Sequence, residues 1–183
     1  PLVRQVLTGA DGPAASAPFF SALSIPCRIG FFWEMDKTAP DFSFEEAAFA
    51  KGAVFVVGVD EVGRGPLAGP VTAAAVRLRA GRIPVGLNDS KKLTARRRET
   101  LFDQIMADAD VCIAHASVAE IDELNILRAS HLAMLRAVQG LPFQAEFALI
   151  DGNMLPKGLL CPAQAIIGGD ARSLSIAAAS VVA

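Results

Sequence analysis

The sequence predicts an α/β fold, a central mixed sheet flanked by helices, because three patterns occur together. Short apolar runs rich in β-branched residues, such as 54–60, have the length and composition of buried strands. Longer segments, such as 94–107, place apolar residues at helical spacing. Strands come first along the chain and then alternate with helices, which is the order expected of a layered α/β domain.

Capping and helix-breaking residues set the boundaries of these elements. Ser43, with Glu46 three residues later, begins a short helix, and Thr94 begins the next one. Gly140 and Pro142 end a third helix. The short connection between the first two strands predicts antiparallel pairing. In order, we expect a helix at 43–51, strands at 54–60 and 71–78, a loop at 79–90, a helix at 94–107, a strand at 111–118, a helix from 122 or 125 to about 138, strands at 147–150 and 165–167, and a helix from 173 onward.

The composition fits one globular domain and gives no global nucleic-acid signature. The chain has 183 residues, is 52% hydrophobic and carries a formal charge of -2 with a pI of about 5.7. Charge is uneven, because Lys and Arg dominate 77–98 and Asp89 is the only acid there. This basic segment could contact nucleic-acid phosphates, or it could simply be a solvent-exposed loop and helix face.

The cysteines and histidines suggest no zinc site or disulfide framework. Cys27, Cys112 and Cys161 are far apart and form no Cys-x-x-Cys pair, so a reducing, cytoplasmic location is expected. His115 and His131 form no metal-ligand pattern with them and are expected to be structural. No apolar run reaches the length of a membrane span.

The stretch 54–76 holds the strongest chemical pattern in the chain. An apolar strand ends in Asp60 and Glu61, and a glycine-framed Arg64 follows. Successive side chains on a strand face opposite sides, so we expect the glycines to bend the chain after Asp60 and bring Glu61 to the same site. The loop would also let a ligand approach the backbone, with Arg64 meeting a phosphate or a sugar. The plain alternative is a polar turn between two strands.

Asp151 stands at the end of another apolar strand, as Asp60 does. If the two strands are neighbours, their acids meet, and clustered carboxylates resist ionising together, so a divalent cation is the natural occupant. Oxygen ligands favour Mg²⁺ or Mn²⁺ over zinc. Two such ions about 4 Å apart could activate a water and stabilise the leaving oxygen of a phosphodiester. Alternatively, Asp151 is a turn aspartate before Gly152.

The run Gly-Val-Asp-Glu-Val-Gly-Arg-Gly-Pro-Leu-Ala-Gly-Pro-Val at 58–71 closely resembles the first motif of bacterial ribonuclease HII. The resemblance recurs in the family's order across about 53–183, at 88–93, 121–127, 149–153 and 169–182. It implies a ribonuclease H-like fold and a catalytic domain at 35–183. By the resemblance, Asp60, Glu61 and Asp151 are catalytic carboxylates that bind Mn²⁺ or Mg²⁺, with two ions per site.

The resemblance also implies how substrate is held. Gly63, Arg64 and Gly65 match the loop with which the family senses a 2′-hydroxyl at an RNA–DNA junction, the group that distinguishes RNA from DNA. Ser90 and Lys91 match a phosphate-contacting segment.

The implied enzyme is an endoribonuclease that hydrolyses the RNA strand of RNA–DNA hybrids and acts in ribonucleotide excision repair. It cuts on the 5′ side of ribonucleotides embedded in DNA and leaves 3′-hydroxyl and 5′-phosphate ends. The implied partner is therefore a hybrid or ribonucleotide-containing DNA, and we expect a monomer with no membrane partner.

Three alternatives remain beside this interpretation. A pyrophosphate-binding glycine loop is disfavoured, because its spacing misses Gly-x-Gly-x-x-Gly and a strand follows it. Another nuclease of the same superfamily, such as an integrase-like enzyme, is disfavoured by the Gly-Arg-Gly loop and the Asp-Ser-Lys segment at 89–91. A non-catalytic hybrid-binding fragment differs from an enzyme by binding without cleavage at saturating metal.

The two ends of the chain carry separate expectations. Residues 1–34 mix Pro, Gly, Ala and Ser without period, so we expect an atypical extension, disordered or not native, with Met35 as the natural start. The resemblance places a fourth aspartate, and a tyrosine at the substrate sugar, beyond Ala183. Asp170 and Ser173 lie in a matching block, where either can cap the last helix.

Overall fold

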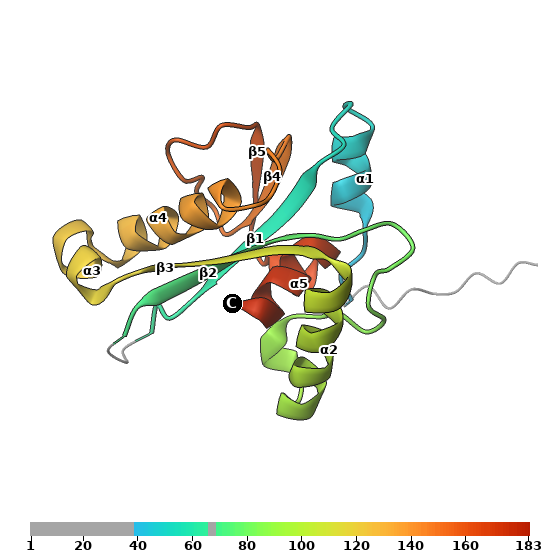
Figure 1. The fold of residues 1–183 in the computed structure, drawn as a ribbon, viewed down its shortest axis with the longest axis horizontal. Coiled ribbons are helices and arrows are strands. Elements are labelled where there is room, and N and C mark those ends of the chain that lie inside the picture. Colours follow the sequence, from blue (N-terminus) through green and yellow to red (C-terminus); the bar gives the residue numbers. More distant parts are fainter. Residues whose placement is uncertain (1–38, 66–68) are drawn as a thin grey trace, which may run out of the picture. The chain divides into compact units, whose positions relative to one another are not determined.

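The computed structural model describes residues 39–65 and 69–183 (Figure 1). The expected extension at 1–34 lies outside these residues. In the described part of the chain, no helix combines the length and apolar character that a membrane crossing requires.

A five-stranded mixed sheet forms the centre of the domain. Its order is β3-β2-β1-β4-β5, with antiparallel pairing of β1 with β2 and of β2 with β3, and parallel pairing of β1 with β4 and of β4 with β5. The predicted mixed sheet and the antiparallel first pair are therefore confirmed. The strands are β1 (Val56–Val62), β2 (Val71–Arg77), β3 (Asp110–Ala116), β4 (Phe147–Asp151) and β5 (Ala163–Ile166).

Helices cover both faces of the sheet, so the central strands β1, β2 and β4 are largely buried (Figure 1). On one face, α4 packs against β1, β2 and β3, whereas α5 and α2 cover the other face. The helical elements are α1 (Ser43–Phe49), the 3-10 turn η1 (Ser90–Lys92), α2 (Ala95–Asp108), α3 (Val118–Leu124), α4 (Ile126–Gln139), the 3-10 turn η2 (Gly169–Ala171) and α5 (Leu174–Val182).

Two expected boundaries are wrong for local reasons. The single helix expected from 122 or 125 is two helices, because Asn125 has a φ of 70° and separates α3 from α4. The start of α3 coincides with a capping box, in which Ser117 and Glu120 bond each other's backbone N–H groups. The first strand extends to Val62, two residues beyond the expected end.

The alternation of β1 decides which side each of its residues faces. Val57 and Val59 pack in the cluster that includes α4, whereas Gly58 lies against the backbone of α5. Asp60, two residues after Gly58, therefore faces the α5 side, and Glu61 faces the α4 side. This contact between β1 and α5 places the start of α5 beside the strand end.

We expect Gly58→Ala to destabilise the protein by about 3 kcal/mol or more, because overpacking a core against backbone leaves no room for relaxation. An added Cβ would lie 2.2 Å from Ser175 C and 2.4 Å from Ile176 N. Urea unfolding measures the loss, with Gly69→Ala as the matched control, since a Cβ there meets nothing within 4 Å. Equal unfolding midpoints for the two variants would contradict the close approach.

Candidate functional site

Asp60 is the buried centre of the candidate site. It follows the apolar part of β1, is 6% exposed, and its Oδ1 accepts a hydrogen bond from Glu61 N at 2.8 Å. Burial, together with the charges of Asp151 and Glu61, raises the pKa of Asp60 to about 8. The ionised form of Asp60 is therefore destabilised by its burial and by the neighbouring acids.

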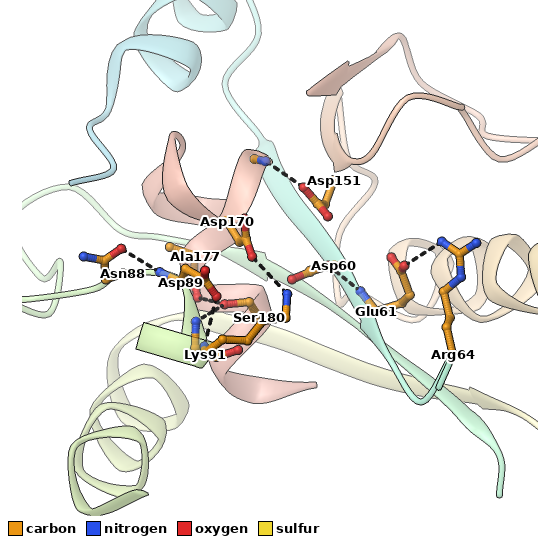
Figure 2. Close-up of polar contacts among 12 residues, drawn as sticks. Asp60, Glu61, Arg64, Asn88, Asp89, Lys91, Asp151, Asp170, Ala177 and Ser180 are labelled. Carbon is orange, nitrogen blue, oxygen red and sulfur yellow. Dashed lines mark hydrogen bonds and ion pairs between the residues drawn. The ribbon is translucent and has the colours of Figure 1, made fainter. Parts of the chain in front are cut away.

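Asp151 meets Asp60 because β4 is the parallel neighbour of β1. The register pairs Val59 with Ile150, so the two acids are the next residues on adjacent strands. Asp151 Oδ1 accepts a 2.6 Å hydrogen bond from Gly169 N, at the start of η2 (Figure 2). The predicted meeting of the two strand-end acids is confirmed.

Asp170, which we expected only as an alternative to Ser173 for capping the last helix, adds an acid to the site. It lies in η2 and is buried, and its Oδ2 pairs with Lys91 Nζ at 3.5 Å. Burial raises the pKa of Asp170, and the charges of Asp89 and Asp151 add to the rise. Figure 2 shows Asp60, Asp151, Asp170 and Lys91 around one region of the structure. Asp170 is therefore a further acid beside Asp60 and Asp151.

Glu61 does not join the other acids in the expected way. Because β1 stays regular through Val62, there is no bend after Asp60, and the Glu61 side chain turns to Arg64 instead, with Oε1 at 3.1 Å from Nη1 (Figure 2). Its Oε2 is buried and has no hydrogen-bond partner in the described part of the chain. Burial raises the pKa of Glu61, although Arg64 opposes this shift.

The glycine loop begins directly after β1. Gly63 has a φ of 96°, and an added Cβ would lie 2.8 Å from Pro70 O, so this position requires glycine. Arg64 and Gly65 are exposed. The rest of the loop, 66–68, lies outside the described residues.

The segment 88–91 lies on the side of the acidic cluster (Asp60, Asp151 and Asp170) away from the glycine loop (Figure 2). Asp89 caps η1 by accepting a 2.9 Å hydrogen bond from Lys91 N, and Ser90 N donates to Ser180 Oγ of α5 at 3.3 Å. These bonds hold Lys91 beside Asp170, with its side chain otherwise exposed to solvent. A cation that is fixed at one end and open to solvent can meet a phosphate.

The donor set fits a hard divalent cation. Asp60, Asp151 and Asp170 offer only oxygen ligands, and Glu61 Oε2 is a buried, unpartnered oxygen among the described residues. However, across 39–65 and 69–183 no three acidic, His or Cys side chains converge closely enough to hold an ion as they stand. Asp151 is hydrogen-bonded to Gly169 N, and Glu61 and Asp170 are in ion pairs, so a cation would have to displace these partners.

Comparison with known proteins gives one consistent family. The Ribonuclease HII family model matches residues 57–183. The curated Ribonuclease HII of Cereibacter sphaeroides (strain ATCC 17025 / ATH 2.4.3) is 67% identical over 149 residues, which cover 81% of this chain and 70% of that protein.

Solved structures show the same architecture. The ribonuclease H2 of Pyrococcus horikoshii OT3 is 28% identical, with a TM-score of 0.61 over 69% of each chain. Bst-RNase HIII in complex with Mn²⁺ is 20% identical, with a TM-score of 0.61 over 74% of this chain and 52% of that one, and this likeness supports the fold alone.

The stability of the metal-free protein should fall as pH rises from about 4 to 8, because folded Asp60 keeps a proton that the unfolded chain releases. Asp60→Asn removes the part of this dependence that comes from Asp60 and leaves the part that comes from the raised pKa values of Glu61 and Asp170. The substitution should therefore stabilise the protein by about 2 kcal/mol more at pH 7 than at pH 5. Urea unfolding in EDTA at both pH values measures the difference, and an equal effect at the two pH values would contradict the raised pKa.

Proposed function

Because this chain belongs to the ribonuclease HII family, we propose that it hydrolyses the RNA strand of RNA–DNA hybrids and cuts 5′ of ribonucleotides embedded in duplex DNA. The observation that carries the proposal is the meeting of Asp60 and Asp151 at the ends of adjacent strands, between the Arg64 loop and Lys91. Buried acids with cations on both sides suit a phosphodiester better than a neutral ligand.

In this proposal Asp60, Glu61 and Asp151, together with Asp170, hold Mn²⁺ or Mg²⁺, two ions per site. When bound, the ions activate a water and stabilise the leaving oxygen of the scissile phosphodiester. The chain's contribution is the pair Asp60 and Asp151, whose backbone positions are fixed by the sheet register, whereas Glu61 and Asp170 would have to leave their present ion pairs to join them. Cleavage leaves a 3′-hydroxyl and a 5′-phosphate.

In this proposal the substrate is positioned by the two segments beside the acids, the loop with Arg64 and the segment with Lys91. Ser90 and Lys91 would bind backbone phosphates, which fix the register of a nucleic acid without reading its bases. Backbone groups at Gly63 and Gly65 would approach the sugar closely and detect the 2′-hydroxyl. Arg64 is paired with Glu61, so the orientation of a metal-site carboxylate is linked to the loop that contacts the substrate.

Asp60→Asn should reduce cleavage at least about a hundredfold while the fold is retained, because one oxygen ligand loses its charge. The assay is cleavage of a labelled DNA duplex carrying one ribonucleotide, with Mn²⁺ or Mg²⁺ and with EDTA as the negative control. Asp103→Asn is the matched variant, since Asp103 is an exposed acid on α2. Cleavage by Asp60→Asn at the wild-type rate would reject the assignment.

The same assay separates an enzyme from a non-catalytic hybrid-binding fragment. Binding of the duplex without any cleavage by the wild-type chain, at saturating Mg²⁺ or Mn²⁺, would favour the fragment. A single metal-dependent cut beside the ribonucleotide would favour the enzyme.

Arg64→Ala should weaken the preference for the ribonucleotide-containing duplex over an all-DNA duplex by about tenfold, because a hydrogen bond to a charged group is lost at the junction. The measurement is the ratio of the two binding constants at fixed salt. Arg96→Ala is the control, because Arg96 is an exposed cation outside the loop and should weaken both constants equally. An unchanged ratio in Arg64→Ala would count against a sensing role for the loop.

A further inference from the structure

A buried carboxylate lies outside the segment that the family model matches. Glu45, on α1, is 1% exposed, and the match begins at residue 57. Its Oε1 accepts hydrogen bonds from Ser173 Oγ at 2.6 Å and from Ser175 N at 2.9 Å. Burying a carboxylate is costly unless hydrogen bonds compensate it, and here only Oε1 has partners among the described residues. These hydrogen bonds join α1 to the start of α5.

Neighbours of Glu45 join the same two segments. Asp41 N donates to Arg172 O at 3.1 Å, and Leu174 N donates to Asp41 O at 3.0 Å. The Arg172 guanidinium lies over the Phe44 ring, 5.0 Å from its centroid. The segment 41–45 therefore holds 172–175 through backbone, side-chain and cation–π contacts together.

A continuous path of hydrogen bonds leads from Glu45 to the acidic cluster. Ser173, whose hydroxyl donates to Glu45, donates its backbone N–H to Gly169 O at 2.8 Å. Gly169 N in turn donates to Asp151 Oδ1 at 2.6 Å, and Asp170 is the next residue along η2. A shift of Ser173 would thus move the turn that orients both acids.

We propose that Glu45 is a positioning residue, which orients Asp151 and Asp170 for cation binding by fixing Ser173 and the η2 turn. The inference rests on the proposed function, because it assigns Glu45 to the same carboxylate site. A residue that only filled space here would be served as well by an apolar side chain, without the cost of burying a charge. Residues that hydrogen-bond the segment carrying a metal ligand hold the ligating carboxylate in place.

The test compares Glu45→Ala with two related variants. Glu45→Gln keeps an oxygen that can accept from Ser173 and Ser175, and Glu46→Ala removes an exposed acid from the same helix. Three quantities are measured: Mn²⁺ affinity by calorimetry, kcat and KM for the ribonucleotide-containing duplex, and amide hydrogen exchange at Gly169 and Ser173 in the metal-free protein.

For Glu45→Ala we expect Mn²⁺ affinity and kcat to fall about tenfold or more, with KM changed less than about twofold because no substrate contact is removed. Exchange at Gly169 and Ser173 should become faster than in the wild type. Glu45→Gln should restore all three quantities to near the wild-type values, and Glu46→Ala should leave them unchanged.

The proposal is overturned if folded Glu45→Ala has a lower melting temperature but wild-type Mn²⁺ affinity, kcat and exchange at Gly169. That result would leave Glu45 a purely structural role. If Glu45→Ala does not fold, Ser173→Ala removes the bridging hydroxyl, which also caps α5 by accepting from Ile176 N, and must show the same losses in part. A wild-type chain that neither binds Mn²⁺ nor cleaves would instead contradict the proposed function, and exchange at Gly169 would still test the positioning.

Discussion

The crowding of buried carboxylates at the ends of β1 and β4 is the constraint on which the rest of the site depends. Asp60 is almost fully desolvated, and the charges of Asp151 and Asp170 raise its pKa further. Such an arrangement opposes ionisation unless positive charge is supplied. Lys91 supplies part of that charge to Asp170, and Arg64 supplies part to Glu61. A divalent cation, as proposed above, would supply more.

Small residues let the backbone bring these acids together. Gly58 allows β1 to lie against the backbone of α5, where a Cβ would collide with Ser175. The facing surface of α5 is built largely from alanine, so the helix sits close to β1 and β2. The η2 turn comes just before α5, so Asp170 lies beside the strand ends. The packing of the core and the geometry of the site are thus set by the same contact.

Local sequence signals predicted much of this arrangement, and the errors have physical causes. Asp60 and Asp151 could be placed because an acid at the end of an apolar strand is a local pattern. The side that Glu61 faces could not, because the strand continues for two residues past Asp60 and only pairing with β2 shows this. The roles of Asp170 and Glu45 were still harder to predict from the sequence, because they depend on contacts between segments far apart in the chain. For Asp170, the sequence showed only its place in a matching block, where it or Ser173 could cap the last helix.

The most direct test of the account is a calorimetric titration of Mn²⁺ into the metal-free chain, with Asp170→Asn titrated in parallel. The account predicts saturable binding to the wild type and an affinity about tenfold or more lower in the variant, since a buried oxygen ligand loses its charge. Equal affinities in the two proteins, or no saturable binding to either, would contradict the claim that these carboxylates form a cation site.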